Sequence, residues 1–480
     1  CSTMPAANRS GNTNESAQNA CAPAHDCLGS SLHSNKLLVD AHLWASRAPR
    51  ASKNAATSYW LRCATSAYQA LENPLPQTSR EAAALATRCT DEFLKVALQN
   101  PAQRWSSGPA QIGNSGITVE FRHPSPYSGG PIILTRAQDV SVHLFGDKRF
   151  TGSGFGVPLA VLAPRCSDRP ECKLIPPEGV FRWAVAWIET EPTGGFSPPR
   201  LVVADPIVTD PPVIGRQRYA LATDTSAFYA QGVRTSKLRR LGIWGLLWGK
   251  EVGKRAGVYL LEDYDPNKRP LVMIHGLGSS PLAWAKLSNA IWGNRDLRAR
   301  FQIWHVVYQT NAPLLVTRRR VQGYLDDAWG MLDPEGDDPA RSGVVLVGHS
   351  LGGVVSRMLC VDSGEVLWNS AFTGPPGQLT GDPADLKAIE NIFVFKPYPG
   401  VSRAIFLAAP HRGSPGASTP TCAGASISRP IARAARTTST YVFSRKNSCR
   451  PAWRRGVART TASTMAPGCR CRCSSRPPTS

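Results

Sequence analysis

The spacing of hydrophobic positions divides the chain into regions of different structure. Residues 35–105 place apolar side chains three and four positions apart with few breakers, which predicts a helical segment of two or three packed helices. Residues 106–215 contain short β-branched or aromatic runs such as GITVEFRH and VFRWAVAWIE between Gly, Pro and Asp, which predicts a β-rich module. Residues 216–416 alternate apolar strands with amphipathic helices. Such alternation is typical of an α/β domain with a parallel sheet covered on both faces.

The two ends of the chain lack these patterns. Residues 1–34 are rich in Asn, Ser and Ala, and this polar composition predicts a flexible tether. Residues 417–480 contain no acidic residue and abundant Arg, Ala, Ser, Thr, Pro and Cys, without strand alternation of useful length. No apolar run approaches the roughly 18 residues that a membrane-spanning helix needs.

Composition and charge narrow the possible classes of protein. The chain has 480 residues, of which 42% are hydrophobic and 19% charged, so several domains with sizeable cores are expected and a wholly disordered chain is excluded. The formal net charge of +21 raises nucleic acid or an anionic membrane as a partner. Twelve of those charges lie in residues 417–480, however, which leaves +9 for residues 1–416. The body of the protein is therefore only mildly basic, and we expect no nucleic-acid partner.

The cysteines are distributed just as unevenly, because five of the 13 lie in residues 417–480. Six of the others lie close together in pairs, which fits disulfides in an envelope or periplasmic protein. Many connectivities are open to six cysteines, so the pairing rests on proximity alone. The pairs expected in this way are Cys21 with Cys27, Cys63 with Cys89, and Cys166 with Cys172. Cys360, in an apolar helical pattern, is interpreted as a buried thiol.

One turn between a strand and a helix carries the features of a nucleophile. The string SGVVLVGHSLGGVVSRMLC reads as a buried strand, a sharp turn and a helix, and its centre is the G-x-S-x-G pattern around Ser350. Gly348 and Gly352 remove side chains that would collide with the chain at such a turn. The amide of Leu351, at the start of the helix, can donate to a developing oxyanion.

A second Gly-rich turn lies upstream, where RPLVMIHGLGSS runs from a buried strand into His275, Gly276, Leu277 and Gly278. With these two motifs, residues 259–414 resemble the α/β-hydrolase family, in particular its lipase and esterase branch. The resemblance implies an α/β-hydrolase parallel-sheet domain with Ser350 as the nucleophile. It also implies that the amides of Leu277 and Leu351 form the oxyanion hole, while the flanking glycines shape the loop and the elbow.

The resemblance fails at the acid and the base. A nucleophilic serine needs a histidine oriented by a carboxylate, and in this family both follow the serine in the order acid, then histidine. The last acidic residue of the chain is Glu390, and the only histidine after Ser350 is His411. His411 belongs to the turn Pro-His-Arg-Gly-Ser, which in bacterial lipases lies beside the site and does not supply the base. Neither expected position is therefore present.

Other polar residues near the motifs do not fill this gap. His275 and His349 are expected to form local hydrogen bonds, and Asp382 and Asp385 are expected to be solvated loop or helix-cap residues. The abrupt change of composition after Gly416 suggests a different explanation, namely that a frameshift replaced the last strands of the domain together with the acid and the base. A basic nucleic-acid arm and a metal site at Cys469, Cys471 and Cys473 are the competing interpretations of residues 417–480, but C-R-C-R-C lacks the usual CxxC spacing of zinc sites.

The first residues resemble the mature start of a bacterial lipoprotein, in which signal cleavage leaves a lipidated cysteine. Cys1 stands at the first position, followed by Ser2 and a polar stretch. The resemblance implies lipidation of Cys1 and a place in the bacterial cell envelope, as a membrane-anchored lipoprotein or in the periplasm. The alternative that the sequence begins at an arbitrary point stays open.

Together these features predict a serine hydrolase of the lipase or esterase type that cleaves a carboxylic ester by acyl transfer through Ser350. Only trace activity is expected of this chain, since its acid and base are missing. The alternative is a non-enzymatic envelope protein that uses a degenerate hydrolase fold as a binding scaffold. The expected partners are an ester or lipid substrate and the membrane, and no metal or other cofactor is expected.

Overall fold

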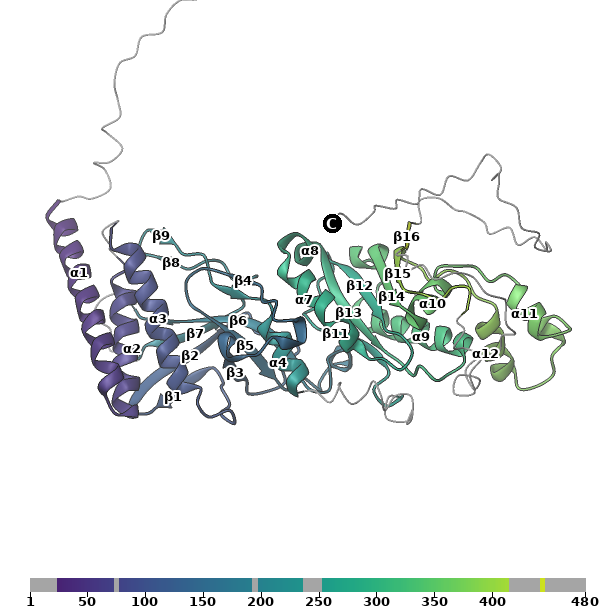
Figure 1. Cartoon of the computed structure of the whole chain (residues 1–480), viewed down its shortest axis with the longest axis horizontal. Helices are drawn as coiled ribbons and strands as arrows, with labels where there is room; N and C mark the ends of the chain where they lie inside the picture. Colours follow the sequence, from purple (N-terminus) through teal and green to yellow (C-terminus); the bar gives the residue numbers. More distant parts are fainter. Residues whose placement is uncertain (1–23, 73–76, 192–196, 236–252, 414–440, 445–480) are drawn as a thin grey trace, which may run out of the picture.

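The computed structural model describes residues 24–72, 77–191, 197–235, 253–413 and 441–444. The described chain forms an elongated molecule with the N-terminal helices at one end and the second large sheet toward the other (Figure 1). We call residues 24–235 the N-terminal unit and residues 253–413 with 441–444 the C-terminal unit. Cys1 and nearly all of residues 417–480 lie outside the described residues. None of the described helices is long and apolar enough to cross a membrane.

Three helices open the N-terminal unit, and the first begins earlier than the sequence pattern indicated. Helix α1 covers Ala24–Arg47, α2 covers Lys53–Gln69 and α3 covers Ser79–Ala97. The predicted tether to residue 34 is thus too long, since helix already starts at Ala24. The Ser- and Asn-containing sequence hides this start, although Leu28 and Leu32 keep the four-residue spacing of a helix.

Two of the three expected cysteine pairs are disulfides in the structure. Cys63 on α2 is bonded to Cys89 on α3, with a Cα–Cα distance of 5.8 Å, so the bridge joins two packed helices. Cys166 and Cys172 close a surface loop, with a Cα–Cα distance of 5.3 Å. The third pair includes Cys21, which lies outside the described residues. Cys360 is half-buried, and its thiol donates to the carbonyl of Ser356 at 3.2 Å.

The sheet of the N-terminal unit has the strand order β1-β2-β7-β6-β5-β3. The strands are β1 (Gly108–Ile112), β2 (Ser115–Arg122), β3 (Ile133–Arg136), β5 (Val157–Ala163), β6 (Val180–Glu189) and β7 (Arg200–Ala204). All neighbours are antiparallel except β2 and β7, which run parallel, so the sheet is mixed. Strand β6 is buried along nearly its whole length, which explains its continuous apolar run.

The helices and this sheet share one core. Helices α2 and α3 both pack on β6, and α3 also contacts β5. The apolar face of α3 includes Leu85, Cys89 and Phe93, all of them buried. The described residues between 24 and 204 thus form one packed body in which the helical segment covers the β-rich module.

The short elements that follow still belong to the N-terminal unit. Strands β4 (Thr151–Gly152) and β10 (Thr223–Asp224) pair, as do β8 (Val213–Ile214) and β9 (Gln217–Arg218). Helix α4 (Ala227–Thr235) packs on β5 and β6. A Cβ on Gly232 would lie 2.7 Å from the ring of Phe181, which shows how closely this helix approaches the sheet. The predicted boundary at residue 216 therefore falls inside the N-terminal unit.

The C-terminal unit contains the second sheet, with the strand order β11-β13-β12-β14-β15-β16. Its strands are β11 (Gly257–Leu260), β12 (Arg269–Ile274), β13 (Phe301–Val307), β14 (Val344–His349), β15 (Val401–Leu407) and β16 (Tyr441–Ser444). The four central strands are parallel, whereas β11 and β16 run antiparallel to their neighbours. The helices between them are α7 (Ala285–Gly293), α8 (Arg295–Arg300), α9 (Leu314–Leu332), α10 (Leu351–Met358), α11 (Val366–Ala371) and α12 (Pro383–Phe393). This is the α/β alternation that the sequence pattern predicts.

The strand order fixes where a site can form. After β12 the chain continues to β13 on one side, and the next strand, β14, lies on the other side of β12. In parallel sheets a crevice opens outside the carboxyl ends of two strands at such a reversal. The residues that follow β12 and β14 therefore meet at one edge of the sheet, and these are the two Gly-rich turns of the sequence.

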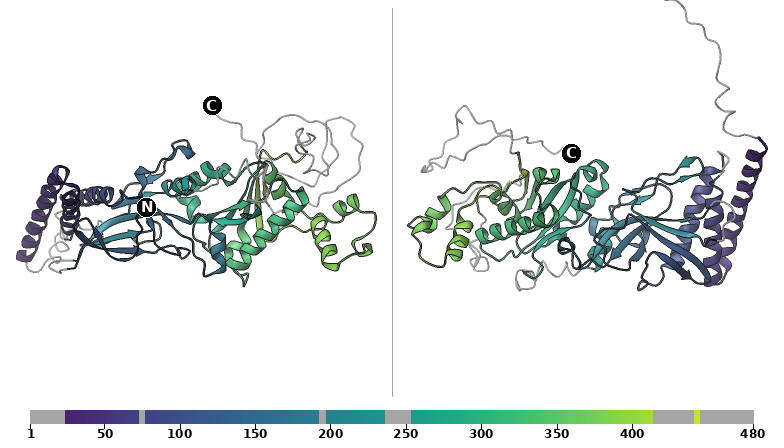
Figure 2. Two further views of the ribbon diagram at one scale, coloured as in Figure 1. Left: turned by 90° about the horizontal axis from the view of Figure 1, so that it is seen from below. Right: turned by 180° about the vertical axis from the view of Figure 1, so that it is seen from behind.

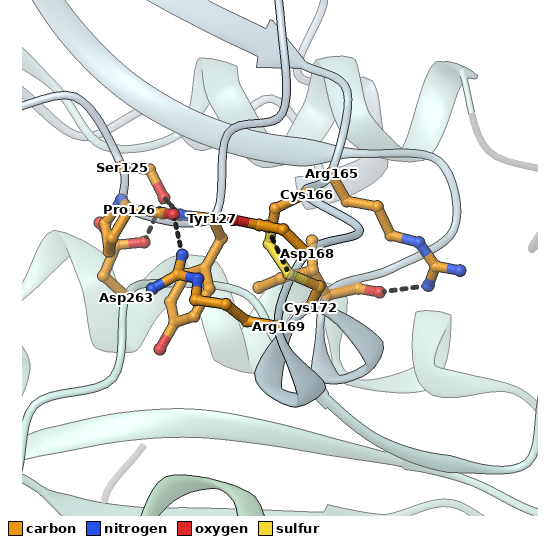
Figure 3. The surroundings of a disulfide bond; sticks show 10 residues. Ser125, Pro126, Tyr127, Arg165, Cys166, Asp168, Arg169, Cys172 and Asp263 are labelled. Carbon is orange, nitrogen blue, oxygen red and sulfur yellow. Dashed lines mark hydrogen bonds between the residues drawn. A yellow bond between two sulfur atoms is a disulfide. The ribbon is translucent and has the colours of Figure 1, made fainter.

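The disulfide-closed loop lies where the two units meet. Its short helix, Pro170–Leu174, contacts β11 and α9 of the C-terminal unit. Figure 3 shows Arg169 of this loop reaching the carbonyl of Pro126, beside Ser125 and Asp263. The hydroxyl of Ser125 donates to Asp263 at 2.6 Å, which joins the N-terminal unit to the segment after β11. The views in Figure 2 show the same side-by-side arrangement of the two units.

Candidate active site

Ser350 stands at a strained turn between β14 and α10. Its backbone angles are φ 51° and ψ −121°, a conformation that residues with a side chain rarely adopt. The turn is held from both sides, since the Ser350 amide donates to the carbonyl of Leu407 at 2.9 Å and its carbonyl accepts from Gly353 at 3.0 Å. Such strain persists only where the surroundings enforce it, and it exposes the serine at the carboxyl end of the sheet.

The glycines around Ser350 are required by space. A Cβ on Gly348 would lie 2.5 Å from the carbonyl oxygen of Gly352, and one on Gly352 would lie 2.0 Å from the carbonyl oxygen of Ile274. Strand β12 and helix α10 thus approach each other closely. Gly353 is confined in the same way although it lies outside the G-x-S-x-G motif, since a Cβ there would lie 2.5 Å from the Cβ of Ala409.

The turn after β12 lies against the serine. A Cβ on Gly276 would lie 2.9 Å from the Cβ of Ser350, so this backbone passes directly beside the serine. Gly278 has a φ of 62°, and its amide donates to the hydroxyl of Thr310 at 3.2 Å. Leu277, between them, is 44% exposed. The structure therefore brings the predicted loop and the predicted elbow together.

His275 has a structural role in this loop. Its Nδ1 lies 3.0 Å from the carbonyl oxygen of Gly276, and its ring stacks on Tyr308 with centroids 4.6 Å apart. The Tyr308 hydroxyl in turn donates to the backbone carbonyl of His275 at 2.5 Å. Burial lowers the pKa of His275 to about 4, so the ring is neutral at pH 7. The local hydrogen bonding expected for His275 is thus present.

The other two histidines near the elbow make no hydrogen bond to Ser350 in the described part of the chain. Nδ1 of His349 is buried there without a hydrogen-bond partner, and the ring packs edge-on against Trp284. Both ring nitrogens of His411 are likewise buried and unpartnered among the described residues, and the ring packs against Phe406. Burial lowers the pKa of His411, and the positive charge of Arg357 lowers it further.

The two late acidic residues belong to a helix start. The Asp382 carboxylate accepts hydrogen bonds from the amides of Ala384 at 2.8 Å and Asp385 at 3.3 Å, which caps α12. Asp385 lies in the first turn of the same helix. Asp382 is therefore a helix cap, as expected, and has no contact with a histidine among the described residues.

A group of three carboxylates lies at the opposite edge of the sheet. The acidic oxygens of Asp333, Asp337 and Asp338 lie within 4.8 Å of one another, close enough for a metal ion. Asp333 is already engaged, since it accepts from Nε of Arg341 at 2.6 Å and from the amide of Gly336 at 2.9 Å. This loop precedes β14, so it lies at the amino end of the strand whose carboxyl end carries Ser350. It does not take part in the site.

The region that contains both Gly-rich turns matches a known protein family. Residues 271–470 match the model of a family described as the Alpha/beta hydrolase family. The match supports an α/β-hydrolase fold for this region. No curated protein and no solved structure matches the chain significantly. The matched range runs past Gly416 and so includes most of residues 417–480.

Three residues outside the sequence motifs hold the candidate site in shape. Thr310 and Tyr308 both follow β13, the neighbour of β12, and both anchor the loop of residues 275–278 through hydrogen bonds. The carbonyl of Leu407, at the end of β15, anchors the Ser350 amide. No local motif marks these residues, because their roles come from strands that are distant in the sequence. Only their positions at the carboxyl ends of predicted strands could have pointed to them.

Proposed function

We propose that the hydrolase domain is of the lipase and esterase type and cleaves a carboxylic ester by acyl transfer through Ser350. The observation that carries the proposal is the strained backbone of Ser350 at the β14–α10 turn, with Gly276 packed against it. Strain of this kind is kept where it serves a reaction. Ser350 is therefore presented as a nucleophile rather than as a surface serine.

The proposed reaction uses the two turns in different ways. The Ser350 hydroxyl oxygen attacks the ester carbonyl, and the carbonyl oxygen becomes an oxyanion. The amides of Leu351 and Leu277 donate to that oxyanion, and α10 adds the positive end of its dipole. Collapse expels the alcohol and leaves an acyl-serine, which water hydrolyses to the acid. Each step needs a base to take a proton and return it, and no histidine is hydrogen-bonded to Ser350 in the described residues.

Because no base is in contact with Ser350 among the described residues, we expect this chain to hydrolyse esters slowly. In serine hydrolases the loss of the triad histidine removes most of the rate, and the oxyanion hole with substrate binding retains roughly 10³–10⁴-fold acceleration over water. We therefore propose that this chain has only trace esterase activity.

Covalent labelling tests whether Ser350 is a nucleophile. The full chain is incubated with a fluorescent fluorophosphonate, beside the Ser350→Ala variant and a Ser107→Ala control at an exposed serine before β1. Slow labelling that disappears only in Ser350→Ala supports the proposal. Equal labelling of all three proteins, or of none, contradicts it. Rapid, Ser350-dependent hydrolysis of a short acyl ester would contradict the proposed trace activity, because it would show that a base is present. The variant His411→Ala would then test whether His411 is that base.

The second candidate is a non-enzymatic envelope protein that uses the hydrolase fold as a binding scaffold. The two buried, unpartnered nitrogens of His411 favour it, because this histidine is engaged with no carboxylate among the described residues. Complete absence of fluorophosphonate labelling in a folded protein would support this candidate.

We also propose lipidation of Cys1 and a location in the cell envelope. The disulfides Cys63–Cys89 and Cys166–Cys172 fit an oxidising compartment, where such bonds persist. Metabolic labelling with an alkyne fatty acid, compared between the native precursor and its Cys1→Ser variant, tests the anchor. Loss of label in the variant supports it.

A further inference from the structure

A cleft outside the hydrolase domain has a size and lining suited to a small molecule. It measures about 1020 Å³, at the upper end of ordinary ligand sites, and lies in the N-terminal unit between α3 and the segments of β4, β5, β9 and β10. Helix α3 contributes one face at helical spacing, namely Arg80, Ala83, Ala84, Thr87, Arg88 and Asp91. Ser350 is not part of this cleft, so the cleft is a second site.

The strands give the cleft an apolar side. Phe155, Val157 and Pro158 line it together with Tyr219. The rings of Phe155 and Tyr219 lie 5.7 Å apart, and both residues are buried. The hydroxyl of Thr87 accepts from the amide of Gly156 at 3.1 Å, which ties α3 to the strand side. An apolar chain of a ligand can therefore pack on a surface that is already ordered.

The acidic residues in the lining already accept hydrogen bonds from neighbouring groups. Asp91 accepts from Arg136 at 3.0 Å and from Gln138 at 3.0 Å. Asp224 accepts from Arg149 at 2.6 Å and from two amides at the start of α4. These carboxylates hold the walls of the cleft, and both oxygens of each already accept hydrogen bonds from the protein.

Three arginines of the lining are in the opposite situation. Arg80, Arg88 and Arg218 are exposed, and within the described ranges none of their side chains has an ion pair or a hydrogen bond. An apolar cleft with three uncompensated guanidinium groups has one chemical complement. We propose that it binds an amphipathic anion, with an acyl or alkyl chain on the apolar side and a carboxylate or phosphate head at the arginines. Guanidinium groups suit both heads, because their paired donors match the oxygens of either anion.

Displacement of a fluorescent amphipathic anion tests this site in the full chain. The probe is 11-(dansylamino)undecanoate, and the competitors are decanoate, decyl phosphate, decanol and inorganic phosphate. We expect displacement by decanoate or decyl phosphate, whose relative strength identifies the preferred head, and at least tenfold weaker competition by decanol and by inorganic phosphate. Equal competition by decanol would overturn the proposal, because the arginines would then contribute nothing.

Variants locate the binding in the cleft. Arg80→Gln with Arg218→Gln should weaken probe binding by about tenfold or more, as expected for the loss of two charge-assisted hydrogen bonds. The bonds from Ser79 to Gln217 and Tyr219 hold these two arginines at the same end of the cleft. Arg50→Gln, on an exposed arginine away from the cleft, is the matched control and should bind as the unaltered chain does. Ala84→Trp should block the cleft. Binding that is unchanged in the double variant and in Ala84→Trp would overturn the proposal. Ser350→Ala should bind the probe normally, so this test does not depend on the hydrolase function.

Discussion

Arg182 of β6 forms an ion pair with Asp263, which lies in the segment after β11, across the boundary between the two units. Nε of Arg182 donates to Oδ1 of Asp263 at 3.0 Å, and an Nη2 donor reaches the same oxygen. The guanidinium group also donates to the carbonyl of Leu261 at 3.1 Å. Arg182 is only 9% exposed, so Asp263 rather than water compensates its charge. The first sheet is thereby fixed to the edge of the second sheet.

Asp263→Ala should therefore destabilise the whole protein. The substitution leaves a nearly buried guanidinium group without its carboxylate, and a lost partner of this kind costs about 1–3 kcal/mol. Chemical unfolding followed by tryptophan fluorescence measures the effect. Asp210→Ala, at an exposed aspartate with no partner in the described structure, is the control and should change the free energy of unfolding by less than about 0.5 kcal/mol. Equal effects of the two variants would contradict the role of the pair.

The disulfide between α2 and α3 should contribute more to stability than the one in the surface loop. Cys63 and Cys89 are 26 residues apart, and Cys166 and Cys172 are six apart. In the chain-entropy model these loops correspond to about 3.5 and about 2.3 kcal/mol. Replacing each pair by alanines should lower the melting temperature more for the first pair. The reverse order would show that the surface loop acts chiefly through its contacts with β11 and α9.

Because β12 passes close to the turn at Ser350, a substitution of Gly352 tests the geometry of that turn. Gly352→Ala places a Cβ about 2.0 Å from the carbonyl oxygen of Ile274, so it should abolish fluorophosphonate labelling and lower the melting temperature. Gly330→Ala, on the exposed face of α9 with nothing within 4 Å of the new Cβ, is the matched control. It should stabilise the protein by about 0.5–1 kcal/mol, because glycine is unfavourable inside a helix. Normal labelling of Gly352→Ala would contradict the elbow geometry.

Buried neutral histidines should make the protein sensitive to acid. Burial lowers the pKa of His275 to about 4 and that of His305, which contacts Ser288, to about 3. The unfolded chain takes up these protons near pH 6.5, whereas the folded chain does not, so stability falls as the pH drops from about 6.5 toward 4. Unfolding free energies measured across this range should rise with pH. In a His305→Asn variant, the slope of the unfolding free energy against pH should be smaller by the equivalent of one proton. An unchanged slope would contradict the lowered pKa of His305.

The contrast between predicted and unpredicted features has a physical basis. The turn at Ser350 could be predicted because its requirements are local: a strand, two glycines and a helix start. The pairs Cys63–Cys89 and Cys166–Cys172 followed from proximity in the sequence. The packing of α3 on β5 and the clamp from Thr310 to Gly278 join segments far apart in the chain, so no periodicity reveals them. The packing of α4 on the first sheet could not be predicted from the sequence either, because the pattern of an amphipathic helix does not indicate which sheet the helix covers.

The chain lacks the acid and the base that the resemblance leads us to expect after Ser350. We propose that residues after Gly416 are read out of frame, on the ground of their acid-free, Arg-rich composition. The family match, which runs to residue 470, speaks against this proposal. The gene read in its other frames after codon 416 should encode strand-like runs followed by an Asp or Glu and a His. A chain rebuilt in that frame should hydrolyse short acyl esters about 10³–10⁶-fold faster than the given chain, because a complete triad supplies such a factor. If no frame encodes such residues, or the rebuilt chain is equally slow, the frameshift proposal is wrong and the scaffold function gains support.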